Sequence, residues 1–187
     1  MRIKIKDTHQ FILVFDTEYD GDNLVQFAGI MLKKVDAEHY ELYRTGNVFV
    51  KQKLSKYFTK YTKLTQDYID INGVSLEKAK EEILDKFLCN INTNSILVTS
   101  HGVKNDLRVL YENGISLSHD DWYYYDLDSY CTHNHSQKAL GRNSRLGLDD
   151  VAREGNFINA VPHNAFVDAW ATLIAFCYLK EKEEQQC

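Results

Sequence analysis

The pattern of apolar and polar positions predicts a sheet in the first part of the chain. Phe11 to Phe15 is an uninterrupted apolar run that ends in acidic residues, which is typical of a central strand buried on both faces. Leu24 to Lys34 and Glu38 to Lys51 are rich in β-forming residues around a short polar turn, so they are expected to form an antiparallel hairpin. Ile96 to Ser100 is expected to be a further short strand, and Trp122 to Asp126 a fifth.

Helices are indicated by a different spacing of apolar residues and by residues that cap helix ends. After Ser75, apolar side chains recur three or four residues apart up to Phe87, as on one face of a helix. Helices are expected to begin near Ser75, Gly102, Gly147 and Asn164. Strands followed by alternating helices and strands imply an α/β fold, with a mixed five-stranded sheet flanked by helices.

The length and composition describe one ordinary folded domain, residues 1–187. The chain has 44% hydrophobic and 26% charged positions, a single proline, and no repeat that would indicate a linker or a second domain. The longest apolar stretch, Leu173 to Leu179, is far too short to cross a bilayer, so membrane insertion and secretion are not expected. The four cysteines have no paired spacing, which favours free thiols and a reducing, cytoplasmic location.

The net charge of −5 restricts the kinds of nucleic-acid-binding protein that the chain could be. A protein that coats nucleic acid through bulk electrostatics needs a basic surface. A nuclease does not need a basic surface if bound cations cover its acidic site. The net charge therefore disfavours a protein that only coats nucleic acid and does not exclude a nuclease.

The first candidate site is the acidic end of the apolar run. Side chains two residues apart in a strand leave on the same face, so Asp16 and Glu18 would project together where the central strand ends. Two such oxygen ligands suit a hard cation. The alternative is that this acidic sequence only opens a surface turn, helped by Asp20 and Gly21.

A second candidate is Asp106, within a predicted helix. It lies three residues after Val103 and four before Leu110, on the apolar stripe of that helix. Asp106 is therefore expected to face the core, where a carboxylate is costly unless it is paired, hydrogen-bonded or bound to metal. The alternative is a salt bridge to Lys104 or Arg108, which project from other parts of the helix surface.

The third candidate pairs His163 with Asp168. In a continuous helix, a separation of five residues would place them about 140° apart, so they could not serve one site. They can do so if Pro162 holds the chain extended and Asn164 caps the helix, because His163 then lies in the preceding loop. The alternative is that this histidine is only a polar loop residue at a helix start.

Together and in this order, the three segments resemble the DEDDh family of 3′-to-5′ exonucleases, which includes the proofreading subunit of bacterial DNA polymerase III, ribonuclease T and oligoribonuclease. The segments are DTE from Asp16, HGVKND ending at Asp106, and HNAFVD ending at Asp168. The segment Leu148 to Ala152, LDDVA, also has a counterpart in the family. The resemblance covers most of the chain.

The resemblance implies a ribonuclease H-like α/β fold and a two-metal nuclease site. The implied ligands of two Mg²⁺ or Mn²⁺ ions are Asp16, Glu18, Asp106 and Asp168, with Asp16 bridging. The implied general base is His163; the sister group instead has a tyrosine at the position of Asn164. Two such cations stabilise the attacking and leaving oxygens of a phosphodiester. A histidine with a pKa near about 6.5 can accept the proton of the attacking water at neutral pH.

Candidate contacts to nucleic acid are less specific. They are Thr17, Tyr19, His101, Lys56 and Lys60. The two lysines belong to a stretch that mixes basic and aromatic side chains, which suits phosphates and bases, although a solvated helix face or loop is the alternative. The second segment departs from the family pattern at Gly102 and Asn105, which leaves the metal ligands intact but changes the surroundings of the terminal nucleotide.

The resemblance implies that the substrate is the 3′ end of a single-stranded nucleic acid. No residue identifiably tests for a 2′-hydroxyl, so DNA and RNA both stay open. The expected product is a nucleoside monophosphate. Association with a polymerase or another nucleic-acid enzyme, or with a second copy of the chain, is an open expectation. Two other function classes also stay open: a catalytically silent nucleic-acid-binding module of the same fold, and a metal phosphohydrolase that acts on nucleotides.

Overall fold

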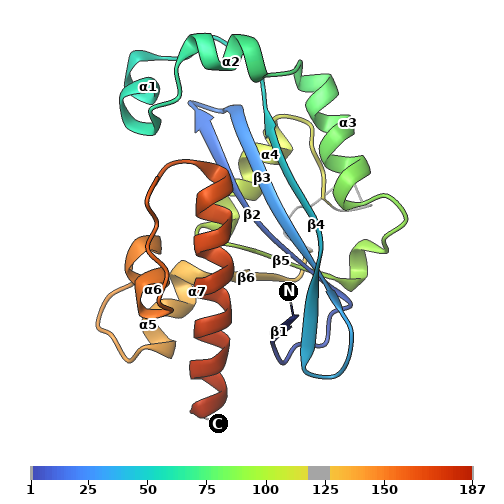
Figure 1. Cartoon of the computed structure of the whole chain (residues 1–187), viewed down its shortest axis with the longest axis vertical. Coiled ribbons are helices and arrows are strands. Elements are labelled where there is room, and N and C mark those ends of the chain that lie inside the picture. Colours follow the sequence, from blue (N-terminus) through green and yellow to red (C-terminus); the bar gives the residue numbers. More distant parts are fainter. Residues whose placement is uncertain (1, 118–126, 187) are drawn as a thin grey trace.

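A computed structural model describes residues 2–117 and 127–186 of the chain. In this part of the chain, six strands form one sheet in the order β1-β4-β3-β2-β5-β6 (Figure 1). The strands are β1 (Arg2–Lys4), β2 (Phe11–Asp20), β3 (Asn23–Lys34), β4 (His39–Phe49), β5 (Ile96–Ser100) and β6 (Ser129–Cys131). The first four pair antiparallel, whereas β5 runs parallel to β2 and β6 parallel to β5, so the sheet is mixed.

The helices lie on both faces of the sheet and beyond one of its ends. They are α1 (Lys56–Thr62), α2 (Gln66–Asn72), α3 (Leu76–Phe87), α4 (Val103–Glu112), α5 (Thr132–Ala139), α6 (Leu148–Glu154) and α7 (Ala165–Gln185), with a short 3₁₀ helix, η1 (Thr93–Ser95). The longest helix, α7, packs on one face with α5 and α6 beside it, while α3 and α4 pack on the other. Figure 1 shows α1 and α2 across the end where β2 stops.

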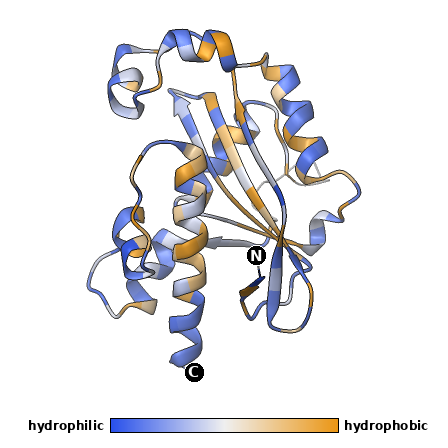
Figure 2. Cartoon of the chain, in the orientation of Figure 1, coloured by the Kyte–Doolittle hydropathy of each residue, from blue (hydrophilic) through white to orange (hydrophobic). Residues whose placement is uncertain are grey.

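The side chains of β2 alternate between two apolar cores. Leu13 and Phe15 belong to the core shared with α3 and α4, whereas Ile12 and Val14 belong to the core under α7. All four are fully buried, which confirms the prediction of a central strand buried on both faces. Figure 2 shows that α7 is mainly hydrophobic in its first half and hydrophilic towards its C-terminal end.

Most of the predicted elements are present. The residues named as helix starts are the N-cap residues of α3, α4, α6 and α7: Ser75, Gly102, Gly147 and Asn164. The predicted hairpin is formed by β3 and β4. The sequence did not predict α1 and α5 as helices, which have only seven and eight residues.

Within residues 2–117 and 127–186, the sheet has six strands rather than the predicted five. The fifth predicted strand, Trp122 to Asp126, lies outside the described residues, and β6 is formed by Ser129–Cys131. The other addition is β1, whose three residues pair with β4. Strands of three residues are too short to show an alternating pattern, so the sequence gives no sign of them. Among the helices described, none is both long and apolar enough to span a membrane.

Candidate active site

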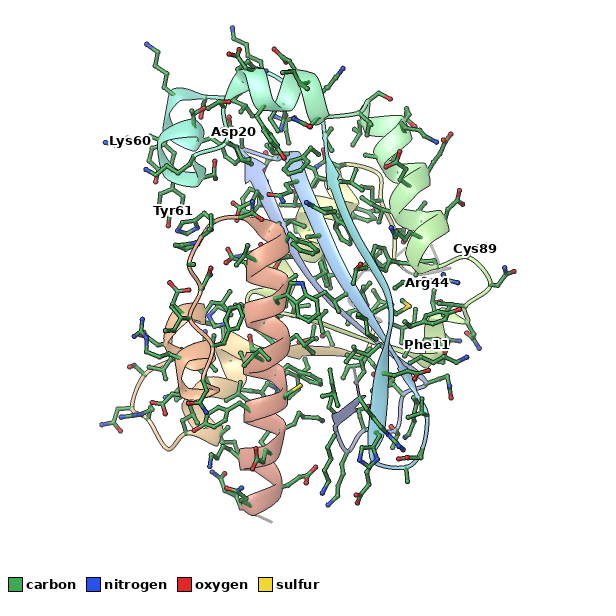
Figure 3. All side chains as sticks on the ribbon, in the orientation of Figure 1. Phe11, Asp20, Arg44, Lys60, Tyr61 and Cys89 are labelled. Atoms are coloured by element: carbon green, nitrogen blue, oxygen red, sulfur yellow. The ribbon has the colours of Figure 1, made fainter. Side chains whose placement is uncertain are left out.

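An open cavity of about 1030 Å³ lies at the end of β2, between α1, α4, α6 and the loop that precedes α7. Eight of the ten site residues that the sequence singles out line it: Asp16, Thr17, Glu18, Tyr19, His101, Asp106, His163 and Asp168. The other two, Lys56 and Lys60, are exposed on α1 and do not line the cavity. Figure 3 shows Lys60 pointing outward while Tyr61 points towards the loop before α7, so contact between these lysines and a bound strand stays a prediction.

Asp16 and Glu18 lie within β2 rather than after it. The strand continues to Asp20, and the turn to β3 begins only at Gly21, whose φ of +67° glycine adopts without strain. The alternative that the acidic sequence opens a surface turn is therefore wrong. By the alternation of the strand, Asp16 and Glu18 share the face that is covered by α7. The pairing with β3 shifts after Glu18, an irregularity of the kind that re-aims side chains near active sites.

Asp106 reaches the cavity from α4, on the opposite face of the sheet, and is only 6% exposed. Thr17 donates two hydrogen bonds to its Oδ1, from the backbone N–H at 3.2 Å and from Oγ1 at 2.6 Å. The Ser100 hydroxyl donates to its Oδ2 at 2.6 Å. Arg108 instead pairs with two other carboxylates, so the structure does not support the salt-bridge alternative for Asp106.

His163 lies in the loop before α7, as predicted, with Asn164 as the helix cap. The Asn164 side chain accepts hydrogen bonds from two backbone N–H groups of the first turn, at 3.2 and 3.4 Å. The backbone N–H of His163 donates to Oδ2 of Asp168 at 2.9 Å, and the Asn159 amide donates to Oδ1 at 2.5 Å. His163 has a φ of +63°, the left-handed conformation, so its backbone is held by these contacts rather than by its own preference.

The side chains from these elements converge. A ring nitrogen of His163 and carboxylate oxygens of Glu18 and Asp168 all lie within 4.8 Å of one another, a spacing that could hold one metal ion. Asp16 lies close enough to be repelled by the other three carboxylates. The four carboxylates, which come from β2, α4 and α7, therefore face a common volume.

The hydrogen bonds leave each carboxylate able to bind a cation. An ionised carboxylate has about four lone-pair positions. Asp106 accepts three hydrogen bonds, which leaves about one position, and Asp168 accepts two, which leaves about two. In the described part of the chain, no donor is hydrogen-bonded to the carboxylate of Asp16 or Glu18. Asp106 and Asp168 are thus fixed in orientation, while the β2 pair keeps its full capacity for ligation.

The electrostatics of the site favour a cation. Burial raises the pKa of Glu18 to about 8, with repulsion from Asp168 and Asp106 adding to the shift. Burial and then repulsion from the other carboxylates raise the pKa of Asp16 well above its ordinary value. Burial also raises the pKa of Asp106 and Asp168, although hydrogen bonds oppose it. Without metal the cluster therefore holds protons at neutral pH, and oxygen donors of this kind fit Mg²⁺ or Mn²⁺.

A row of rings leads from the surface of α1 to the acidic cluster. Tyr57 and Tyr61 are stacked, with ring centroids 6.1 Å apart and planes 7° from parallel. The ring of Tyr61 lies 4.0 Å from that of His163. Tyr57 is 77% exposed and Tyr61 53% exposed, and both line the cavity. These rings are available to a ligand.

Three further residues at the site were not predicted to belong to it: His133, Asp149 and Asn159. A ring nitrogen of His133 lies 3.3 Å from one of His101, and burial together with this neighbour lowers the pKa of His101 to about 4. Asp149 belongs to the LDDVA segment, which is the signal that could have identified it. Asn159 lies in the irregular loop between α6 and α7, where no pattern marks it.

Comparison with known proteins shows which solved structures share this fold. No protein-family model matches the chain, and no curated protein matches its sequence. A structure of E. coli exonuclease I in complex with single-stranded DNA, in a zinc-bound form, matches with a TM-score of 0.70 and 15% identity over 96% of this chain. The chain spans 42% of the length of exonuclease I.

Two smaller nucleases match over a larger share of their own length. A 3′-exonuclease that recognises the 3′ end of histone mRNA stem-loops has a TM-score of 0.70 and 15% identity, with 95% of this chain and 84% of that chain covered. Cell-death related nuclease 4 has a TM-score of 0.66 and 15% identity, with 95% and 64% covered. The chain therefore has the fold of these exonuclease structures, which confirms the fold that its resemblance to the DEDDh exonucleases predicts.

Proposed function

We propose that the protein is a metal-dependent 3′-to-5′ exonuclease that releases nucleoside monophosphates from single-stranded DNA or RNA. One observation carries the proposal: four carboxylates and a histidine from three distant segments line one cavity, on a fold shared with solved 3′-exonucleases. The residues are Asp16, Glu18, Asp106, Asp168 and His163.

In this proposal the four carboxylates hold two divalent cations, Mg²⁺ or Mn²⁺. Asp16 would lie between them, in keeping with its repulsion by all three other carboxylates. Asp106 would contribute a single oxygen, because its hydrogen bonds leave about one lone pair free. Bound cations would polarise the scissile phosphodiester and stabilise charge on its attacking and leaving oxygens.

His163 would act as the general base. Its ring lies at the edge of the acidic cluster, within reach of Glu18 and Asp168, and packs against Tyr61. The hydrogen bond from its backbone N–H to Asp168 fixes the loop on which the ring is carried. In this position the imidazole can accept a proton from a water molecule that attacks the phosphorus atom, a contribution of about 10²–10⁴-fold in rate.

The exposed tyrosines support a preference for single strands. Stacking of an unpaired base on an aromatic side chain contributes about 1–3 kcal/mol and tolerates any sequence. Tyr57 and Tyr61 offer two such rings directly beside His163, and Tyr19 lines the same cavity from β2. Bases in a duplex are already stacked and paired, so they could not use these rings without unpairing.

Cleavage of labelled strands tests the proposal. With Mn²⁺, single-stranded DNA or RNA labelled at the 5′ end should shorten stepwise from its 3′ end. Asp16→Ala should abolish this shortening, and His163→Asn should slow it by about 10²–10⁴-fold while keeping a residue that tolerates the left-handed backbone. Asp85→Ala, which removes an exposed carboxylate of α3 away from the cavity, should change nothing.

The other function classes give different results in the same assay. Binding of the labelled strand without products would indicate a catalytically silent module. Release of phosphate from mononucleotides, with intact strands, would indicate a nucleotide phosphohydrolase. Either result would contradict the exonuclease proposal.

A further inference from the structure

The side chain of Asn159 bridges two carboxylates at the site. Its Nδ2 donates to Oδ1 of Asp168 at 2.5 Å and to Oδ1 of Asp149 at 3.1 Å. Asp168 lies in the first turn of α7, Asp149 lies in the first turn of α6, and Asn159 lies in the loop between these helices. A single amide group therefore connects the cavity's α6 wall to a carboxylate of the acidic cluster.

The orientation of this amide is determined by its partners. The backbone N–H of Val161 donates to Oδ1 of Asn159 at 3.2 Å, so that atom must be the acceptor. The two carboxylates can only accept, so the atom that faces them must carry the hydrogens. All three contacts are satisfied by the same orientation. At this position an aspartate could keep only the contact to Val161, and an alanine could make none of the three.

This bridge complements the second contact to Asp168. The backbone N–H of His163 occupies Oδ2, and Asn159 occupies Oδ1, so the carboxylate is held at both oxygens. The remaining lone pairs then have fixed directions. Asp149 in turn holds Asn159, because it accepts from the same amide nitrogen while lining the cavity.

We propose that Asn159 is a positioning residue for Asp168 and that Asp149 anchors it. The inference rests on the proposed function, in which Asp168 is a metal ligand. Groups that hydrogen-bond to a metal ligand orient it, and their removal commonly weakens metal binding or activity by about 10–100-fold. Asn159→Asp should have the larger effect, because it replaces the donor with a charge that repels both aspartates. Asn159→Ala should have a smaller effect of the same sign.

The test is a calorimetric titration of the full chain with Mn²⁺, which reads metal binding without requiring cleavage. Asn159→Asp is compared with Asn156→Asp, which adds the same charge to the same loop at an exposed position. Both aspartate and asparagine tolerate the left-handed conformation found at Asn156, so its backbone should be preserved. Asp149→Ala, which removes the acceptor that anchors Asn159, completes the set, and circular dichroism checks that each variant is folded.

The inference predicts Mn²⁺ affinity at least about tenfold weaker for Asn159→Asp, and wild-type affinity for Asn156→Asp. If Asn159→Asp does not fold, the Mn²⁺ affinity of Asn159→Ala is the test, and an affinity weaker than that of the wild type supports the inference. Wild-type affinity in both Asn159 variants, or an equal loss in Asn156→Asp, would overturn the inference. Mn²⁺ binding without any cleavage by the wild type would contradict the exonuclease proposal alone, whereas a wild type that binds no Mn²⁺ would overturn the metal site and this inference with it.

Discussion

Glu18 illustrates the cost of gathering carboxylates in one cavity. In the unfolded chain its proton dissociates near the ordinary pKa of 4.5, whereas burial and its acidic neighbours raise the folded pKa to about 8. Between these values the metal-free folded state binds more protons than the unfolded state, so stability must fall as the pH rises. We expect the melting temperature of the metal-free protein to decrease between about pH 5 and 8, measured by thermal unfolding.

The variant Glu18→Gln isolates this effect, because it cannot ionise. Its melting temperature should decrease less steeply over the same pH range, and the wild type saturated with Mg²⁺ should also lose the steep decrease because the cation replaces the proton. Two histidines contribute equally in both proteins: His9, whose pKa is raised, acts in the same direction, and His101, whose pKa is lowered to about 4, acts in the opposite direction below about pH 6.5. Parallel curves for wild type and Glu18→Gln would show that Glu18 is not perturbed in this way.

Two site residues show which individual positions of the site can be predicted from the sequence and which cannot. Asp106 could be predicted because it interrupts an apolar helical stripe, so its burial follows from its neighbours four residues away. Asn159 could not, because its partners lie nine and ten residues away across an irregular loop. Periodicity carries information about regular elements only, and hydrogen bonds between loop side chains depend on the finished fold.

The cap of α7 affects both the stability of this helix and the position of the site residue His163, which directly precedes the cap. Asn164 caps the helix, and the next residue, Ala165, donates its backbone N–H to the buried Gln26 of β3 at 3.2 Å. Loss of a helix cap reduces stability by about 1 kcal/mol. We expect Asn164→Ala to lose about this amount in urea unfolding and also to reduce nuclease activity, because the loop that carries His163 would move.

Ser75→Ala is the matched control for this effect. Ser75 caps α3 through its side chain, and it does not line the cavity. Its replacement should cost a similar amount of stability, about 1 kcal/mol, and leave activity unchanged at temperatures where the protein is folded. Equal losses of activity in both variants would mean that the cap acts only through global stability.

The short helix α1 is the element that we expect to contact bases. Tyr57→Ala should weaken binding of single-stranded oligonucleotides by about 1–3 kcal/mol, because one stacking surface is lost. Fluorescence anisotropy with a labelled strand in Ca²⁺, which supports binding with little expected cleavage, measures this change. Tyr43→Ala, at a 41% exposed position of β4 that does not line the cavity, should leave affinity unchanged. Equal affinities for wild type and Tyr57→Ala would remove α1 from the binding surface.

Elements were predictable where the local signal was long enough. The caps at Ser75 and Asn164 stand before helices of 12 and 21 residues, whose apolar positions identify them. In contrast, α1 has seven residues and a basic, aromatic composition that a loop could share. Its helical form depends on packing, since Phe58 is buried in a small core with Val25 and Phe49 of the sheet. Tertiary contacts of this kind do not appear in a local pattern.

At the scale of the whole molecule, the site combines residues from helices on both faces of the sheet, which come together at the end of β2. Asp106 arrives with α4 on one face and Asp168 with α7 on the other (Figure 1), while Asp16 and Glu18 lie on the strand between them. A cation that binds this cluster therefore binds the folded state and not the unfolded chain. Metal binding and global stability are consequently linked.

This linkage would also reconcile the acidic protein with the polyanionic substrate that we propose. The net charge of −5 would repel nucleic acid from the protein as a whole. Two divalent cations would contribute +4 inside the cavity, where the four carboxylates contribute −4, and so remove the repulsion at the point of cleavage. Affinity for a strand is therefore expected to depend on the divalent cation itself.

The stoichiometry of Mn²⁺ binding tests the central claim most directly. Calorimetric titration of the wild-type chain should show two Mn²⁺ ions bound per protein, with protons released at neutral pH because the cluster is protonated without metal. Asp16→Asn, which removes the carboxylate that we propose to lie between the two ions, should abolish at least one binding event. A wild-type chain that binds no Mn²⁺, or an Asp16→Asn variant that binds it as the wild type does, would contradict a two-cation nuclease site in this cavity.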